Sequence, residues 1–263
     1  MLTRHAITKR AEDDQVDAAA VVERDYVLAH IVAQLSHAAP SDGGRLVFKG
    51  GTALRFVHIE GYRYSADLDF TVIGGGEDAA ISAVGAVLDM AREHAGLPHL
   101  TLSEGHSSVI EYIGPLGSAR PKKLKLDLAT EEHVAAIAQL SMGNIWPDLP
   151  AAVPFDVYPI EEISAEKLRC IIQRVQCRDL YDLYRLSENV GIDLASIRPL
   201  FEDKCRVKKI DPAVFAGRFA DRVDRYRQRW GGEMSEHIAD VPRFDAVERI
   251  LRRNLRQSGF IGD

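Results

Sequence analysis

Two aspartates one residue apart, Asp67 and Asp69, are the side chains of this 263-residue sequence best placed to do chemistry. They lie in an apolar segment, residues 67–72, that reads as a strand. Because side chains alternate between the faces of a strand, both carboxylates share one face, while Leu68 and Phe70 share the other. Mg²⁺ is commonly held by one or two carboxylates together with substrate phosphates. The segment therefore predicts a magnesium site, although the same pattern also occurs on ordinary surface strands.

A glycine-rich turn precedes these aspartates, at Gly50-Gly51-Thr52. It joins a short predicted strand to a predicted helix, and glycines there let a phosphate approach the backbone near the unpaired N–H groups of a helix start. A simple tight connection is the alternative interpretation.

A third carboxylate follows at Asp127, in the alternating segment 123–128. Its leucines share one face and Lys125 and Asp127 the other, as in a half-buried strand. Three carboxylates on adjacent strands would make a two-metal site that clamps the attacking and leaving oxygens. The alternative is an edge strand with surface charges.

Charged residues also recur in the helical stretch 161–189, where a continuous helix would bring four of them into one arc: Lys167, Arg174, Arg178 and Asp182. A break near Gln176 and Cys177 is the alternative, since Arg178-Asp179 resembles a fresh helix start. The arc could equally be a solvated face.

The elements that must position these residues divide the chain into two parts. We expect an α+β domain over residues 1–155 and a helical domain over 156–263, divided near the proline-rich segment 147–159. In the first part, spacing predicts helices over 11–38, 52–59 (with Thr52 as its cap) and 77–95, a turn at 41–44, and strands over 45–48, 67–72, 99–103, 109–113 and 124–129.

Composition narrows the class of protein. Hydrophobic residues make up 46% and charged residues 27%, as in soluble globular proteins, and no apolar run is long enough to span a membrane. The N-terminus lacks the apolar core of a signal peptide, and three cysteines without metal-ligand spacing suggest free, mostly buried thiols in the cytoplasm.

Charge is unevenly distributed: the net charge of −6 divides into −8 for residues 1–159 and +2 for the rest. The second part holds a basic stripe at helical spacing, next to a parallel apolar stripe of Phe219, Val223, Tyr226 and Trp230. Such a stripe could follow a phosphate backbone, or simply face solvent. Its members are Arg218, Arg222, Arg225 and Arg229, with Lys204, Arg206, Lys208 and Lys209 upstream.

Taken in order, these segments resemble the four motif regions of the AbiEii/AbiGii toxin family, nucleotidyltransferase-like toxins with a DNA polymerase-β-like fold that include the MenT toxins. The similarity covers residues 20–190 and rests on Gly50-Gly51-Thr52, Arg63-Tyr64-Ser65-Ala66-Asp67-Leu68-Asp69-Phe70, Leu126-Asp127, Ala165-Glu166-Lys167-Leu168 and Arg178-Asp179-Leu180-Tyr181-Asp182-Leu183. Many members of the wider superfamily have Gly-Ser where this chain has Gly51-Thr52, which retains the hydroxyl.

The resemblance implies a role for each matching residue. The turn Gly50-Gly51-Thr52 would hold a nucleoside triphosphate, and Asp67 and Asp69 would bind metal, with Asp127 as a further metal ligand or base. Lys167 would contact the triphosphate, and Asp179 or Asp182 would complete the nucleotide pocket. Ser65 is included among the nucleotide-binding residues, and we hypothesise that a phosphate on it would silence the enzyme by adding negative charge beside the metal.

The function implied is that of a cytoplasmic, monomeric toxin with a cognate antitoxin. It would use Mg²⁺, with Mn²⁺ as an alternative, to transfer nucleotides from NTP to the 3′ end of tRNA and so block translation. The competing interpretations are transfer to a protein hydroxyl (AMPylation) or to a small molecule such as an aminoglycoside, and an interaction protein that merely retains the fold. The intact Asp67, Asp69 and Asp127 argue against the last.

Overall fold

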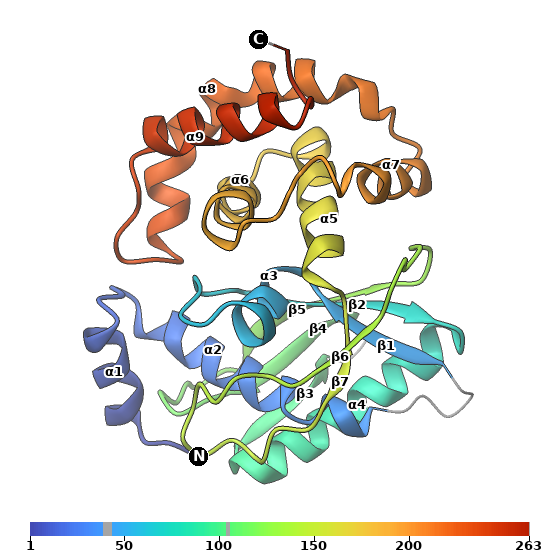
Figure 1. Cartoon of the computed structure of the whole chain (residues 1–263). Coiled ribbons are helices and arrows are strands. Elements are labelled where there is room, and N and C mark those ends of the chain that lie inside the picture. The colour runs from blue at the N-terminus through green and yellow to red at the C-terminus, as the bar shows by residue number, and fades with distance from the viewer. Residues whose placement is uncertain (39–43, 104–105, 263) are drawn as a thin grey trace. The chain divides into compact units, whose positions relative to one another are not determined.

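The computed structural model describes residues 1–38, 44–103 and 106–262, so most of the turn predicted at 41–44 lies outside the described residues. The chain forms two compact units, Met1–Tyr158 and Pro159–Asp263 (Figure 1). The division falls after Tyr158 rather than after residue 155. The physical reason is a short strand, β7 (Phe155–Val157), which pairs with β1 and so belongs to the sheet of the N-terminal unit.

The N-terminal unit is built on one mixed sheet in which the described strands follow the order β3-β4-β5-β2-β1-β7-β6. Pairing is parallel between β2 and β5 and between β1 and β7, and antiparallel elsewhere. The predicted mixture of strands and helices is confirmed, with two strands, β6 and β7, that sequence spacing did not reveal. The remaining strands are β1 (Arg45–Lys49), β2 (Asp67–Ile73), β3 (His99–Ser103), β4 (His106–Ile113), β5 (Lys122–Ala129) and β6 (Ala138–Leu140).

The predicted helix over 11–38 is wrong as a single element. It divides into α1 (Arg4–Asp13), α2 (Ala19–Val32) and a 3₁₀ turn, Leu35–His37. The chain leaves α1 through Gln15, whose φ of 54° lies in the left-handed region and cannot continue a right-handed helix. Val16 nevertheless remains buried and ties back to the Ala11 carbonyl, so the apolar spacing continues across the break.

The helix predicted over 52–59 begins earlier and lacks the predicted cap. It consists of α3 (Gly50–Ala53) followed by a π-helical turn, Leu54–His58. Lys49 occupies the N-cap position but its side chain makes no capping hydrogen bond, while the Thr52 hydroxyl donates to the backbone carbonyl of Asp67 at 2.5 Å. Thr52 therefore ties the helix to β2 instead of closing its N-terminus.

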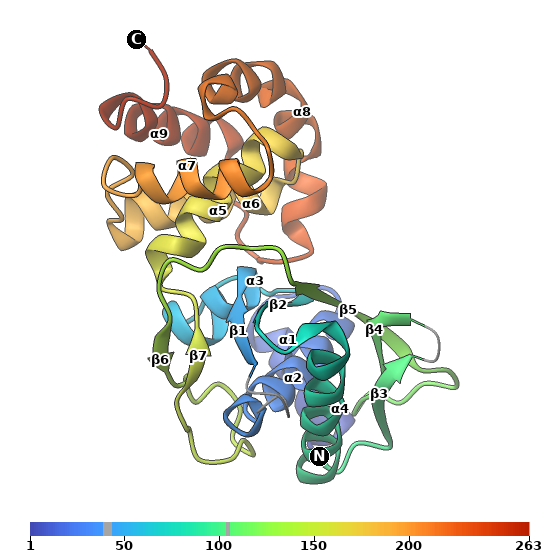
Figure 2. The same cartoon turned by 90° about the vertical axis from the view of Figure 1, so that its right-hand side faces the viewer.

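The core of this unit lies along one face of the sheet. Leu68 and Phe70 of β2 are fully buried, as are Phe48 of β1 and Leu126 of β5. Helix α4 (Gly76–Ala95) crosses β2 and β3 and packs against α2 (Figure 2). Burying each such side chain contributes about 1.5–3 kcal/mol. This packing holds the apolar face of β2 inside the unit, so Asp67 and Asp69 must point to its other face.

The C-terminal unit is helical throughout, as predicted. Its long helical stretch breaks at Arg174–Gln176, where Arg174 and Gln176 adopt extended backbone conformations. The apolar stripe of α8 is buried, which confirms its predicted anchoring role. The helices are α5 (Ile160–Gln173), α6 (Cys177–Tyr184), α7 (Arg198–Val207), α8 (Phe215–Ser235) and α9 (Phe244–Gln257), with short turns at Arg185–Val190 and Pro212–Val214.

The three cysteines are free and buried, as predicted. Burial raises the pKa of Cys170 and Cys205 to about 11 and that of Cys177 to about 12, so all three thiols stay protonated at neutral pH. Within the described part of the chain, no helix is both long enough and apolar enough to cross a membrane.

Candidate functional site

The strand β2 presents Asp67 and Asp69 on one partly exposed face. Its register places Asp69 opposite Asp127 of the parallel strand β5 and opposite Lys49 of the antiparallel strand β1. Residues opposite each other on neighbouring strands share a face and lie about 5 Å apart. The fold therefore brings together the three carboxylates that the sequence singled out.

The three carboxylates lie on neighbouring strands without forming a metal-binding cluster among the described residues. No group of three or more His, Cys, Asp or Glu residues in the described ranges is arranged to hold a metal ion. Asp127 is half-exposed and pairs with Lys125, its neighbour on the same face, at 3.6 Å. Exposed ion pairs of this kind contribute at most about 1 kcal/mol, so the pair leaves Asp127 able to turn.

The glycine turn lies directly against Asp69. Gly50 has a φ of +77°, and a Cβ added there would lie 2.3 Å from the Asp69 carboxylate oxygen Oδ2. Only glycine adopts this conformation readily, and only glycine leaves room for the carboxylate. The Thr52 hydroxyl bond to the Asp67 carbonyl makes a second connection two residues away along β2. The turn and the two aspartates thus form one packed unit.

Arg63 and Ser65 lie beside the second glycine of the turn. A Cβ on Gly51 would meet Arg63 Nη2 at 2.8 Å and Ser65 Oγ at 3.2 Å. Both side chains are buried, and Arg63 donates to the backbone carbonyl of Tyr64 at 3.0 Å. The sequence did not assign Arg63 a role, although it belongs to the same motif. A phosphate on Ser65 would require this segment to move, because the hydroxyl is buried against the glycine.

Sequence reasoning also missed a buried polar network on the Asp69 face. Lys49 forms an ion pair with Glu132, and the two side chains are 8% and 7% exposed. Thr71 bonds Tyr158 Oη at 2.7 Å and donates to Glu132 Oε2 at 3.2 Å. The available signal was Lys49 itself, a cation that directly follows the apolar run Leu46-Val47-Phe48. Buried charges are usually paired, so a buried lysine there required a carboxylate partner.

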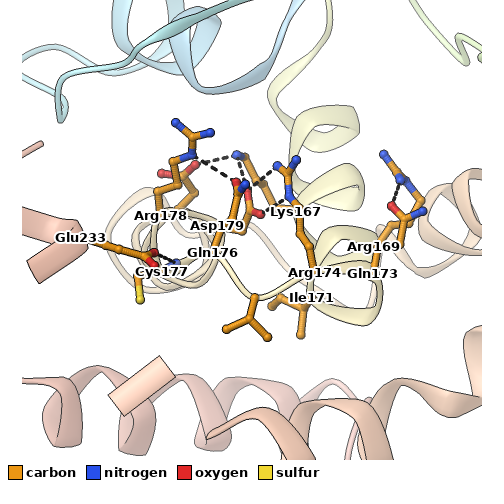
Figure 3. Close-up of polar contacts among 12 residues, drawn as sticks. Lys167, Arg169, Ile171, Gln173, Arg174, Gln176, Cys177, Arg178, Asp179 and Glu233 are labelled. Carbon is orange, nitrogen blue, oxygen red and sulfur yellow. Dashed lines mark hydrogen bonds and ion pairs between the residues drawn. The ribbon is translucent and has the colours of Figure 1, made fainter. Parts of the chain in front are cut away.

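In the C-terminal unit, Lys167 lies between two aspartates. Its Nζ is 3.0 Å from Asp179 Oδ1 (Figure 3). It is 2.7 Å from Asp182 Oδ2, and all three side chains are buried. Arg174 adds a second cation, with Nε 2.8 Å from Asp179 Oδ2. The sequence left open which of these aspartates completes a nucleotide pocket; in the structure both contact Lys167. They meet because α5 and α6 pack against each other across the break.

The charges of this cluster balance one another. Burial by itself raises the pKa of the Asp179 carboxyl, but Lys167 and Arg174 outweigh it through charge and hydrogen bonds and hold that pKa below its usual value. Asp179 is therefore ionised at neutral pH. A buried lysine paired in this way keeps its positive charge in a fixed place.

Arg178 borders a pocket in the same unit. Its Nε donates to Gln176 Oε1 at 3.2 Å. The pocket has a volume of about 240 Å³ and is lined by Gln176, Arg178, Arg229, Glu233, Glu236 and His237. Its lining carries cations and carboxylates together, so it offers both donors and acceptors to a polar ligand.

The four arginines of the predicted stripe on α8 divide into two kinds. Arg218 and Arg225 are exposed and make no hydrogen bond or ion pair with a described residue. Arg222 and Arg229 instead donate to backbone carbonyls at the break between α5 and α6. The stripe in sequence therefore corresponds to two arginines that bond no described residue and two that bond the backbone, of which Arg229 is half-exposed.

Comparisons with known proteins identify the family and the fold of the chain. The model of the family described as the nucleotidyl transferase AbiEii toxin, type IV toxin–antitoxin system, matches residues 34–253. A search of the curated proteins finds no match. Among solved structures, the chain is similar to MenT4, a nucleotidyltransferase toxin from Mycobacterium tuberculosis H37Rv, with a TM-score of 0.71 at 22% identity. That similarity covers 98% of this chain and 90% of MenT4, and it shows a common fold. Because the family model matches most of this chain, the chain belongs to the AbiEii nucleotidyltransferase toxins of type IV toxin–antitoxin systems.

Proposed function

We propose that this toxin transfers nucleotides from a nucleoside triphosphate to the 3′ end of tRNA, in a reaction that depends on Mg²⁺, and so blocks translation. The observation that carries the proposal is the packing of Gly50 against Asp69, in register with Asp127. A turn free of side chains beside strand carboxylates is what a triphosphate and its cation require.

The residues present fit a divalent cation of this kind. Asp67 and Asp69 supply hard oxygen donors on a partly exposed face, and Asp127 lies at the neighbouring strand position. Mg²⁺ needs only one or two protein carboxylates when substrate phosphates complete its shell. When bound, the cation neutralises charge on the phosphate oxygens; Mn²⁺, which prefers similar ligands, would serve as well.

The protein's own residues then account for binding and proton transfer. Gly50, Gly51 and Thr52 let the triphosphate lie along the first turn of α3, and the buried guanidinium of Arg63 adds positive charge next to Gly51. The family motif implies that Lys167, which Asp179 and Asp182 hold, contributes an ammonium group to the triphosphate. Each of these interactions offsets negative charge on the phosphates.

The reaction is an in-line displacement. The acceptor hydroxyl oxygen forms a bond to the α-phosphorus, the bond from that phosphorus to the bridging oxygen breaks, and pyrophosphate leaves with that oxygen. The hydroxyl proton passes to a base, for which Asp127 is our candidate because it is half-exposed and adjacent to Asp69. Positioning supplies most of the acceleration in such reactions.

For the acceptor, the support is the family and the charge of the C-terminal half. Residues 160–263 carry +2 against −8 for the remainder, and Arg218 and Arg225 stand exposed on α8. A basic helical surface suits an RNA backbone better than a small molecule. We propose further that the toxin acts as a cytoplasmic monomer that a cognate antitoxin neutralises.

The test is incubation of purified protein with Mg²⁺, each labelled NTP in turn, and either total tRNA or a protein extract. Label on the 3′ end of tRNA is expected, with Asp69→Asn lowering the rate roughly a thousand-fold because one of its ligand oxygens is replaced by an amide. Asp89→Asn, an exposed carboxylate on α4, is the matched control and should leave the rate unchanged. Label in protein instead of tRNA, or full activity of Asp69→Asn, would contradict the proposal.

A further inference from the structure

Side chains of α8 reach the break between α5 and α6, which we call the α5–α6 turn (Arg174–Gln176). Arg222 donates from Nη1 to the carbonyl of Ile171 and, at 3.3 Å, to that of Arg174. Tyr226 donates its hydroxyl to the Arg174 carbonyl at 3.2 Å. The last carbonyls of a helix have no partner within it, so these bonds satisfy groups that α5 leaves open.

The same helix also holds the start of α6. Arg229 donates from Nη1 to the carbonyl of Val175 at 2.9 Å, and its Nε pairs with Glu233. Glu233 in turn accepts from the backbone N–H of Cys177, the first residue of α6, at 2.9 Å (Figure 3). A carboxylate at a helix N-terminus is favoured by the unpaired N–H groups there. Both sides of the turn are thus fixed by one face of α8.

The α5–α6 turn joins the helix that carries Lys167 to the helix that carries its two partners. Lys167 comes from α5, its partners Asp179 and Asp182 come from α6, and Arg174 of the turn itself binds Asp179. Burial, together with the nearby charge of Asp179, raises the pKa of Tyr226, so its hydroxyl remains a donor. A change in the path of the turn would move the two aspartates relative to the lysine they hold.

We propose that Arg222 and Arg229 are positioning residues for NTP binding: they set the α5–α6 turn and thereby the place of Lys167, and they do not contact the acceptor. This divides the α8 stripe by function, since Arg218 and Arg225 are exposed and bond no described residue. The inference rests on the proposed role of Lys167 in binding the triphosphate.

Arginine-to-alanine variants at all four positions test the division. Binding of the NTP that the transfer assay selects is measured by titration calorimetry with Mg²⁺ and no acceptor, and KM for the acceptor by steady-state transfer. For Arg222→Ala and Arg229→Ala, we expect the Kd for NTP to rise roughly ten-fold, because charge-assisted bonds to the turn are lost. Their KM for acceptor should change less than about two-fold. Arg218→Ala and Arg225→Ala should leave the Kd for NTP unchanged, as should Gln228→Ala, an uncharged exposed control on the same helix.

Two readouts separate positioning from general damage to the fold. Hydrogen exchange should accelerate at residues 174–179 in Arg222→Ala while α7 and α9 keep the wild-type rates. Arg222→Lys, which retains a donor near the same carbonyls, should restore most of the NTP affinity. An unchanged Kd for NTP in both alanine variants, or a rise in acceptor KM alone, would overturn the inference.

Lys167→Ala in the same series shows which idea has failed. If this variant binds NTP as tightly as the wild type, the proposed role of Lys167 is wrong. If Lys167→Ala weakens NTP binding and the Arg222 and Arg229 variants do not, the proposed function stands and only the positioning role is wrong.

Discussion

At Asp69, three strands each contribute one charged side chain to the same part of the sheet face. Lys49 and Asp127 lie on either side of it in register, and Gly50 packs against its carboxylate. Around Asp69, the space that Gly50 leaves empty matters as much as the charges of the neighbouring side chains. The carboxylate occupies space that any other residue at position 50 would fill, so its orientation depends on a hydrogen atom in place of a methyl group.

Gly50→Ala should therefore damage both stability and activity. The added Cβ would lie 2.3 Å from Asp69 Oδ2 and force a positive φ on alanine, at a cost of about 1–3 kcal/mol in unfolding free energy. Gly85→Ala is the matched control, since it lies inside α4 with no atom near its Cβ position. The unfolding free energy of Gly85→Ala should rise by about 0.5–1 kcal/mol. Urea unfolding of both variants measures the difference, and equal stabilities would contradict this account of position 50.

Asp179 makes a prediction about pH. Its pKa is lowered in the folded state, so its interactions stabilise the protein fully above the unfolded pKa of about 4 and are lost as pH falls through the folded pKa. Asp179→Asn should cost about 3–5 kcal/mol at pH 7, because it leaves buried cations short of a partner. The difference in unfolding free energy between variant and wild type should narrow below pH 4. Unfolding measured from pH 7 to pH 3 checks this, with the exposed Asp221→Asn as control; a gap that is independent of pH would count against it.

Among the elements, the break after α1 offers the sharpest comparison. Gln15 is exposed and has a φ of 54°, a conformation that costs an ordinary residue about 1–2 kcal/mol. Gln15→Gly should therefore stabilise the protein by up to about 1 kcal/mol. The same change at Gln228, within α8, should destabilise by about 1 kcal/mol. Thermal unfolding of the two glycine variants tests whether their stabilities change in opposite directions. Destabilisation by Gln15→Gly would show that the glutamine side chain stabilises the protein more than the backbone strain destabilises it.

How far the elements could be predicted depended on the kind of signal. Strands with alternating residues, such as β2 and β5, were evident because one face is buried and the other exposed. The break at Gln15 was hidden, because the apolar spacing continues through Val16 on the far side. Strand β7 lay in a proline-rich segment, and its three residues pair only through contacts distant in sequence.

The candidate site was predictable to a similar degree. Residue types and spacing identified Asp67, Asp69 and Asp127, because chemistry restricts which side chains can bind metal and phosphate. They could not reveal Glu132, which lies in a loop and meets Lys49 only through the fold. Nor could they distinguish Arg222 from Arg218, since both share one helix and one residue type.

For the molecule as a whole, the uneven charge leads to a prediction about salt. The N-terminal part is acidic, so an RNA acceptor should be held mainly by the exposed cations of the C-terminal unit. Acceptor binding should weaken as salt rises, and Arg218→Ala should reduce the slope of log K against log salt by about one phosphate contact. Filter binding across a range of NaCl concentrations measures the slope. An unchanged slope in Arg218→Ala and in Arg225→Ala would place the acceptor elsewhere.

The double connection between the glycine turn and β2 has a consequence for protein design. Gly50 accommodates the Asp69 carboxylate, and Thr52 bonds the Asp67 carbonyl across a separation of 15 residues in the chain. Each half therefore constrains the position of the other. A designer who wished to graft this centre onto another scaffold would have to transplant residues 49–69 as a single cassette, together with the strand that carries Asp127. Directed evolution would likewise have to mutate both halves together.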